Sequence, residues 1–222
     1  PRVSSFVSAD IAKILALKPD LVLTFSDLQS NIVAELIKEG LEVHCFNHRD
    51  ICGIFAMIET LGALIGREEK SAILINSLKE KLKTVSEAVF WKKPIRVYFE
   101  EWDTPMITGI RWVTELIEIA GGKDIFIGKS HQNSAKNRVV TSQDVILANP
   151  EVILASWCGK KVRVEKFNSR AGWSNINAIK NNKIFEIKST LILQAGPAAL
   201  TDGLDAIFKI LCQSAQSLRK QS

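Results

Sequence analysis

Three acidic side chains in the middle of the chain are the first candidates for chemistry. Glu100, Glu101 and Asp103 follow the apolar run 95–99. Paired carboxylates can perform acid–base catalysis or ligate a metal ion. Successive residues of an extended segment point to opposite faces, so Glu100 and Glu101 are not expected to act as a pair, and no histidine lies nearby in the sequence. We predict a hydrogen-bonding or loop-shaping role for these carboxylates and no catalytic residue.

A second group brings two histidines and two cysteines together: His44, Cys45, His48 and Cys52. Their spacing matches no standard zinc pattern, and neighbours on a strand such as His44 and Cys45 face opposite sides. Cys52 lies at the start of an apolar helix. We therefore predict no metal site. The four cysteines of the chain are few and scattered, which is typical of free thiols.

Composition excludes several classes of protein. The 222 residues are 46% hydrophobic, which allows one large domain or two small lobes. The net charge of +5 comes from 29 basic and 24 acidic residues that are interspersed, so we expect no nucleic-acid partner. No apolar run approaches the ~18 residues that span a bilayer, and no signal-peptide pattern is visible. Nucleophile elbows, phosphate-binding glycine loops and dinucleotide fingerprints are absent from the sequence.

The elements that must position these residues are first visible in residues 8–25. Ser8 is a candidate helix N-cap, and Asp10 suits the first turn of a short apolar helix. Pro19 prevents that helix from continuing. The run 21–23 then has the character of a buried strand.

Residues 141–157 repeat this arrangement. Thr141 and Asp144 form a capping-box pattern, Pro150 ends the helix, and 152–154 is the apolar strand. The repetition predicts two structurally similar units within one chain.

Each copy continues with a further helix and strand. Residues 32–37 and 173–179 have helical patterns, and strands are expected at 41–46 and 184–187. Short apolar strands that alternate with helices indicate parallel sheets covered by helices. We therefore predict an α/β fold with two small parallel-sheet lobes.

A long helix separates the two copies. Residues 67–89 contain no Gly or Pro and show helical apolar spacing, which predicts a helix about 33 Å long. A strand at 95–99 follows. The expected organisation is an N-terminal lobe at 1–66, a linker helix within 67–93 and a C-terminal lobe at 94–222.

Ligands of parallel sheets bind beyond the carboxyl ends of the strands, so the segments that follow strands are the candidates for binding. Three such segments combine aromatic and polar residues: Phe25-Ser26-Asp27, the stretch 100–109 followed by Arg111 and Trp112, and Ser156 to Lys161. The candidate ligand-binding residues in or beside these segments are Phe25, Ser26, Trp102, Asp103, Arg111, Trp112, Trp157 and Lys160.

Three tryptophans lie in or just after these segments, and two interpretations of them stand. Trp102 and Trp157 either line a cleft for a large flat ligand or cap the sheet as peripheral core, and Trp112 either faces the cleft or begins an inward-facing helix. Gln194, after the apolar run 191–193, is either a ligand contact or a turn residue.

Five short motifs occur in an order known from one family. They are Leu17-Lys18-Pro19-Asp20-Leu21-Val22-Leu23, Ala120-Gly121-Gly122, Asn149-Pro150-Glu151-Val152-Ile153, Arg170-Ala171-Gly172-Trp173 and the long helix. Together they resemble the helical-backbone (class III) substrate-binding proteins of metal-chelate ABC importers. The segments 98–103, 156–161 and 193–197 resemble the cobalamin-binding branch.

The resemblance implies a function as well as a fold. It implies a periplasmic or cell-surface monomer that captures cobalamin, a siderophore or another metal chelate between its lobes, with no resident cofactor and an ABC permease as partner. By position, Phe6 and Phe25 match the aromatic residues of the family's N-terminal lobe, and Trp102 and Trp157 match the loops of its C-terminal lobe.

This chain departs from the family pattern in two places. The family has a further strand and helix before the position of Pro1. Family members that dock onto a permease also carry one surface glutamate in each lobe. At those two positions this chain has Ala12 and Gln143. The neighbouring Asp10 and Asp144 are the candidate permease-docking residues here.

An enzyme on a similar two-lobed scaffold is the alternative interpretation. A chelatase or small-molecule transferase would use Glu101, Asp103 or His131. This alternative requires a carboxylate and the histidine to converge.

Overall fold

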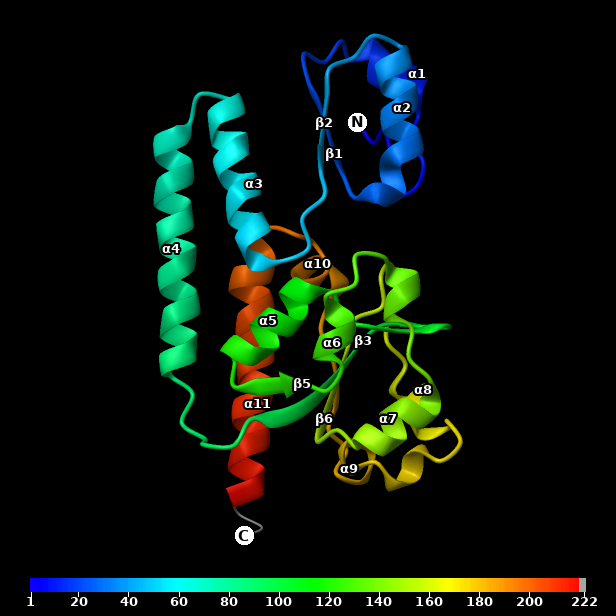
Figure 1. Cartoon of the computed structure of the whole chain (residues 1–222), viewed down its shortest axis with the longest axis vertical. Helices are drawn as coiled ribbons and strands as arrows, with labels where there is room; N and C mark the ends of the chain where they lie inside the picture. The colour runs from blue at the N-terminus through cyan, green and yellow to red at the C-terminus, as the bar shows by residue number, and fades with distance from the viewer. Residues whose placement is uncertain (220–222) are drawn as a thin grey trace. The chain divides into compact units, whose positions relative to one another are not determined.

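The chain forms two compact units, Pro1–His48 and Arg49–Ser222, in a computed structural model that describes residues 1–219. The units can be followed in the colour sequence of Figure 1, where the smaller one is blue. Each unit contains its own sheet. The predicted α/β class with two sheets rich in parallel strands is therefore confirmed.

The smaller unit consists of two helix–strand pairs. Helix α1 (Ile11–Ala16) precedes strand β1 (Val22–Phe25), and helix α2 (Ser30–Lys38) precedes strand β2 (Val43–Phe46). The two strands pair in parallel, with Val22 opposite Val43 and Phe25 opposite Phe46. Both strands therefore end at the same edge of this sheet.

The larger unit opens with two helices that pack against each other, α3 (Ile51–Leu64) and α4 (Glu68–Glu87). Helix α4 matches the predicted long helix. The division between the compact units, however, lies between His48 and Arg49 and differs from the boundaries expected at 66 and 93. The physical reason is that α4 also contacts α5 and α11, so both helices belong to the body of the larger unit.

Five strands form the larger sheet. They are β3 (Ile95–Asp103), β4 (Met106–Thr108), β5 (Gly122–Asp124), β6 (Val152–Ala155) and β7 (Ile184–Glu186). Strands β5, β3, β6 and β7 are parallel, while β4 returns antiparallel along the end of β3. Strand β3 is therefore the centre of the sheet.

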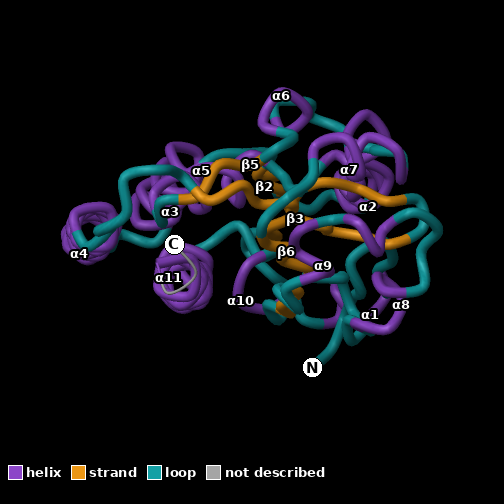
Figure 2. Tube along the Cα trace, turned by 90° about the horizontal axis from the view of Figure 1, so that it is seen from below, coloured by secondary structure: helices purple, strands orange, loops and turns teal. Residues whose placement is uncertain are grey.

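Helices cover both faces of this sheet (Figure 2). They are α5 (Arg111–Ile119), α6 (Ile127–Ser130), α7 (Ser142–Ala148), α8 (Val164–Asn168), α9 (Asn177–Lys180), α10 (Ser189–Ile192) and α11 (Leu204–Arg219). A π-helical turn, Ala199–Gly203, leads into α11, and short 3-10 turns lie at Asp27–Gln29, Ala135–Arg138 and Trp173–Asn175.

The two faces of the sheet bury different side chains because residues alternate along a strand. Tyr98 and Ile153 belong to one apolar cluster with Trp157, Phe167 and Trp173. Their neighbours Phe99 and Leu154 point to the opposite face and are also completely buried. Strands buried on both faces explain the continuous apolar runs in the sequence.

The repeated helix–strand pattern of the sequence has a matching backbone. Asp10 caps α1 and Thr141 caps α7, with Thr141 and Asp144 forming a complete capping box. Lys18 and Asn149, each just before the proline, have positive φ values of 48° and 45°. The expectation that Ser8 caps the first helix is wrong, because the Asp10 carboxylate accepts the bond from the Lys13 backbone N–H.

No helix of the described residues is long and apolar enough to cross a membrane.

The close approach of α3 and α4 generates the first testable prediction. A Cβ added at Gly62 would lie 2.4 Å from Ser71 Oγ and 2.6 Å from its Cβ. We expect Gly62→Ala to lower the free energy of unfolding by about 1–3 kcal/mol through overpacking, measured by urea unfolding. Gly128→Ala is the matched control, because nothing lies within 4 Å of that position. Combining Gly62→Ala with Ser71→Gly should recover stability; no recovery would contradict the packing argument.

A second prediction concerns Asp124, a fully buried carboxylate at the end of β5. Burial raises its pKa to about 6, although hydrogen bonds from Thr114 Oγ1 at 2.5 Å and from the Phe126 N–H at 2.9 Å oppose the rise. A raised folded-state pKa stabilises the protein below the unfolded-state pKa near 4, and this stabilisation is lost as the pH rises through 6.

We expect the unfolding free energy of the wild type relative to Asp124→Asn to fall by roughly 3 kcal/mol between pH 4 and pH 7.5. Urea unfolding at several pH values measures this difference. The exposed Asp202→Asn serves as the control and should show no such trend. A difference between wild type and Asp124→Asn that does not change with pH would show that Asp124 titrates normally.

Candidate functional site

The carboxyl end of β3 carries most of the polar side chains that the sequence singled out. Residues 100–109 were expected to form a loop, but β3 continues to Asp103 and pairs with β4 through Trp102 and Ile107 and through Asp103 and Met106. The backbone N–H of Val140 donates to Met106 and extends this pairing. A hairpin therefore replaces the expected loop, and strand geometry fixes where the acidic side chains point.

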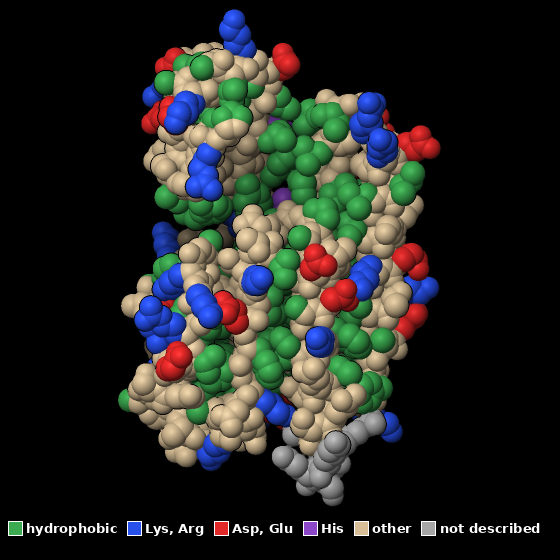
Figure 3. Space-filling model, turned by 180° about the vertical axis from the view of Figure 1, so that it is seen from behind, with side chains coloured by type: hydrophobic (Ala, Val, Ile, Leu, Met, Phe, Trp, Pro, Cys, Tyr) green, Lys and Arg blue, Asp and Glu red, His purple; other side chains and the backbone are tan. Residues whose placement is uncertain are grey.

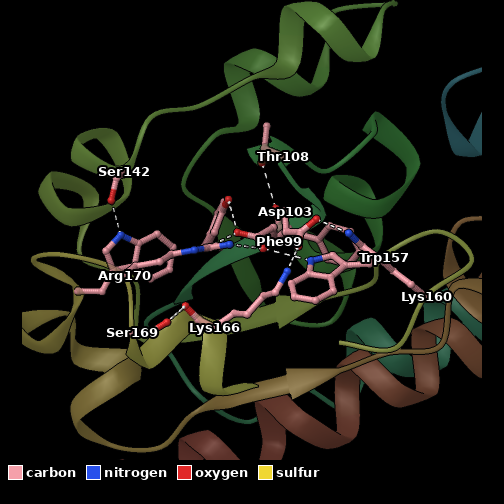
Figure 4. Close-up of polar contacts among 12 residues, drawn as sticks. Phe99, Asp103, Thr108, Ser142, Trp157, Lys160, Lys166, Ser169 and Arg170 are labelled. Carbon is pink, nitrogen blue, oxygen red and sulfur yellow. Dashed lines mark hydrogen bonds and ion pairs between the residues drawn. The ribbon is translucent and has the colours of Figure 1, made fainter. Parts of the chain in front are cut away.

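Glu100 is a completely buried carboxylate in a network of donors that includes Arg170 and Trp157, both labelled in Figure 4. Arg170 donates two hydrogen bonds to it, at 2.6 and 3.0 Å. Trp157 Nε1 donates at 3.1 Å and the Tyr98 hydroxyl at 3.0 Å. An ionised carboxylate needs such donors when it is removed from water. The network joins the segment after β6 and the segment before Trp173 to the centre of the sheet.

Glu101 has a separate set of partners, and the pairing of β3 with β4 is irregular between Glu100 and Trp102. Glu101 binds Arg138 through two hydrogen bonds of 2.7 and 3.0 Å and accepts one from the backbone N–H of Ile110 at 3.1 Å. Arg138 is itself buried and also donates to the Thr108 carbonyl. Both carboxylates therefore have separate arginine partners, and the geometry gives neither the role of a general acid or base.

Asp103 lies below two lysines at the tip of the hairpin. Its side chain is only 2% exposed and forms ion pairs with Lys160 and with Lys166, the latter at 2.8 Å. Burial would raise the pKa of Asp103, but the hydrogen bonds and charges of the two lysines outweigh burial and lower the pKa to about 2. Asp103 is therefore ionised over the whole physiological range. Lys166 was not among the residues predicted from the sequence, because it lies in α8, five residues beyond the end of the predicted segment 156–161.

The three tryptophans have different environments. Trp157 is 2% exposed and stacks on Phe167, with ring centroids 5.9 Å apart. Trp112 is also 2% exposed, and its Nε1 donates to the Ile192 carbonyl at 2.9 Å. The structure thus buries both indoles, which favours the interpretation of Trp157 and Trp112 as core residues over the interpretation that they line a cleft. Trp102 alone of the three is partly exposed, and Lys160 Nζ lies 3.9 Å from its ring centroid.

Arg111 and Gln194 are not equivalent candidates. Arg111 contacts Asp50 at 3.3 Å and Glu115 at 2.9 Å, and Glu115 also accepts a hydrogen bond from the backbone N–H of Ile51. These contacts fix the start of α3 on α5, so Arg111 has a structural role. Gln194 is exposed in the turn after α10.

Beside the hairpin tip lies a surface pocket of about 440 Å³. Its lining is largely apolar and comes from the β3–β4 hairpin and from the segments before α7 and after α8. The lining residues are Asp103, Thr104, Pro105, Met106, Val140, Ser142, Arg170 and Ala171. The pocket shows that concave surface is available next to Asp103 within this unit.

The smaller unit has its own aromatic edge. Phe25 ends β1 and lies 5.1 Å from the His48 ring, while Phe6 is 48% exposed. Gln29 joins these two phenylalanines, because its side chain accepts from the Phe25 N–H at 2.9 Å and donates to the Phe6 carbonyl at 3.0 Å. Sequence reasoning missed Gln29, since a single glutamine in a turn carries no recognisable signal.

Ser26 has a structural task at this edge. It is buried with a φ of 79°, and its hydroxyl accepts from the Leu28 N–H and donates to Asp27. These bonds turn the chain at the end of β1. The side chain is therefore engaged in shaping the edge that presents Phe25.

Asp10 and Asp144 are exposed at the starts of α1 and α7. Backbone hydrogen bonds at these helix starts lower the pKa of both carboxyl groups, and Lys13 and Thr141 supply the respective main contacts. Asp10 is therefore the N-cap residue of α1, whereas Asp144 is the partner of the N-cap Thr141 in the capping box of α7.

Among residues 1–219, no group of three or more His, Cys, Asp and Glu side chains could hold a metal ion. The described cysteines Cys45, Cys52, Cys158 and Cys212 are free thiols, as predicted.

Two α/β units with aromatic and polar side chains at the carboxyl ends of parallel strands define the class of small-molecule binding proteins of α/β architecture. Residues 1–191 match the family model described as periplasmic binding protein, and the chain belongs to that family. The predicted relationship is thereby confirmed, and membership of a family of binding proteins agrees with the expectation that the chain is not an enzyme.

Known relatives are similar over most of this chain. An uncharacterized ABC transporter substrate-binding lipoprotein of Bacillus subtilis, YvrC, is 26% identical over 90% of the chain, which spans 64% of that protein's length. The vitamin B12-binding protein of Vibrio campbellii is 25% identical over 99% of the chain and 77% of its own length. A solved structure of the periplasmic heme-binding protein RhuT from Roseiflexus sp. RS-1 has the same fold, with a TM-score of 0.76 at 18% identity over 95% of this chain and 83% of that one.

The buried Glu100–Arg170 pair generates a prediction for the site. Arg170→Met leaves the Glu100 carboxylate buried with only neutral donors, and we expect a loss of about 3–5 kcal/mol in the free energy of unfolding, measured by urea unfolding. Arg163→Met, at an exposed position of the same segment, should change stability by no more than about 0.5 kcal/mol. Similar small losses in both variants would refute a central role for the pair.

Proposed function

We propose that this chain is a substrate-binding component of an ABC-type importer and that it captures a corrinoid or another metal chelate. The observation that carries the proposal is the placement of aromatic side chains at the carboxyl end of the strands in both units. Phe6 and Phe25 occupy this edge in the smaller unit, and Trp102 occupies it in the larger one. Flat, partly apolar ligands are bound by such side chains.

The proposal assigns different roles to the candidate residues. Phe6, Phe25, Trp102 and Lys160 contact the ligand. Trp157 supports this surface from below, because its buried ring packs on Phe167 and its Nε1 binds Glu100. The mouth of the pocket beside Asp103 adds apolar contact area.

The ligand class is supported by sequence rather than by fold. A relative that bears the name vitamin B12-binding protein matches 99% of this chain, whereas a protein that bears the name heme-binding shares the fold at lower identity. Since one architecture serves both kinds of tetrapyrrole, the side chains at the two edges must select between them. Cobalamin is the first ligand to test and haem the second.

A permease and an extracytoplasmic location complete the proposal. They rest on the family and on relatives described as an ABC transporter substrate-binding lipoprotein and a vitamin B12-binding protein. Asp10 and Asp144 are the proposed docking positions, because they are exposed at the starts of equivalent helices, one in each unit.

Titration calorimetry with cyanocobalamin and haemin tests the binding proposal. The wild type should bind one of them, and Trp102→Ala should weaken binding at least about tenfold because an aromatic contact is removed. Phe6→Ala should also weaken binding. Phe90→Ala is the matched control, since this aromatic is 40% exposed but precedes β3 and so lies toward the amino end of that strand.

The outcomes separate the alternatives. Unchanged affinity in both Trp102→Ala and Phe6→Ala would place the ligand elsewhere on the protein. A wild type that binds neither cyanocobalamin, haemin nor a ferric siderophore at high micromolar concentration would contradict the proposed ligand class.

A further inference from the structure

The segment after β6 is rich in positive charge. Residues 157–170 contain one acidic residue, Glu165, against five basic ones: Lys160, Lys161, Arg163, Lys166 and Arg170. Figure 3 shows Lys and Arg side chains gathered on one side of the larger unit, with few acidic side chains among them.

The ion pairs of the segment balance only part of its positive charge. Arg170 is neutralised by Glu100, whereas Lys160 and Lys166 share the single carboxylate of Asp103. The pair of lysines therefore keeps an excess of one positive charge. Glu186, the other acidic side chain in contact, is engaged with the backbone N–H of Val162 at 3.0 Å.

The two ammonium groups are also held in place and face outward. The lysine side chains are 39% and 49% exposed, while the carboxylate between them is 2% exposed. Lys160 Nζ lies 3.9 Å from the Trp102 ring and 5.1 Å from the Trp157 ring, and Lys166 Nζ lies 5.4 Å from the Trp157 ring. These contacts restrict two side chains that are normally mobile.

Each ammonium group has three N–H donors, of which Asp103 accepts one. Among the residues that the structure describes, the remaining donors of Lys160 and Lys166 have no further hydrogen-bond acceptor. A negatively charged oxygen placed above Asp103 would meet donors from both lysines without displacing the buried carboxylate. Strong hydrogen bonds of this charge-assisted type suit carboxylates and phosphates.

We propose that Lys160 and Lys166 form a preorganised receptor for an anionic oxygen of the ligand, either a carboxylate or a phosphate. This inference rests on the proposed function, since it describes how the same ligand is recognised. Trp102 contacts the apolar face of the ligand, and the lysine pair beside it binds the ligand's negative group. Specificity then depends on charge as well as on shape.

Two pairs of probes test the receptor and distinguish the anion. Haemin and its dimethyl ester differ in the carboxylates, and cyanocobalamin and dicyanocobinamide differ in the phosphate-bearing nucleotide. We expect the wild type to bind the anionic member of one pair about tenfold or more tightly than the uncharged or phosphate-free member. The pair that shows the difference identifies the anion.

Lys166→Gln provides the residue-level test. It should weaken binding of the anionic probe about tenfold, change binding of the matching ester or cobinamide less than about twofold, and reduce the dependence of affinity on salt. Lys161→Gln is the control, because this lysine is exposed in the same segment. Thermal melting of both variants confirms that they are folded.

The failures can be told apart. If the wild type distinguishes the members of neither pair, or if Lys166→Gln weakens both members of the recognised pair equally, the anion receptor is wrong and the proposed function stands. If the wild type binds none of the four probes and no ferric siderophore, the proposed function fails and the receptor fails with it.

Discussion

A carboxylate without exposed surface lies at the centre of the larger sheet, and the surrounding structure depends on its neutralisation. Glu100 lies on the central strand β3, and its carboxylate accepts hydrogen bonds from Arg170, Trp157 and Tyr98. Tyr98 lies on β3 itself, two residues from Glu100, whereas Trp157 and Arg170 come from segments distant in the sequence, so one charge determines how these two segments meet the sheet. Because a buried ion without its partner is costly, the two segments are coupled to β3.

This coupling reaches the surface at the hairpin tip. Trp157 is held by Glu100, and its ring lies near the ammonium groups of Lys160 and Lys166. Those lysines meet at Asp103, three residues along the strand from Glu100. The partly exposed Trp102 therefore packs against the ammonium group of Lys160, which is held by Asp103. Trp157, which also lies near that ammonium group, is held by Glu100.

Much of the fold could be predicted from the sequence because its signals are local. Each of the two helices that end before a proline, and the strand after it, can be recognised from one short segment of sequence, 8–25 or 141–157. The two copies also share a positive φ at the residue before the proline, Lys18 and Asn149. The long helix 67–89 lacks Gly and Pro and is α4 in the structure. The boundary between the two compact units could not be predicted from the sequence. It depends on the packing of α4 against α5 and α11, which no local pattern in the chain indicates.

The candidate site was predicted in part. The end of β3 and the segment after β6 were both selected as segments that follow strands, and the parallel pairing of β3 with β6 brings them to one edge of the sheet. An aromatic residue after a strand gives the same signal whether it is exposed or buried, so sequence could not separate Trp102 from Trp157 and Trp112. Their burial is decided by Phe167 and by the Ile192 carbonyl, which are distant in sequence. Arg170 and Lys166 were not predicted as site residues because their carboxylate partners, Glu100 and Asp103, are also distant in sequence.

Hydrogen–deuterium exchange with and without cyanocobalamin tests the central claim most directly, namely that ligand binds at the carboxyl ends of the strands in both units. Slower exchange is predicted for the backbone around Phe6, for 25–29, for 102–106 and for 157–166, while α3 and α4 stay unchanged. Protection confined to the α3–α4 pair, or confined to one unit, would contradict the account.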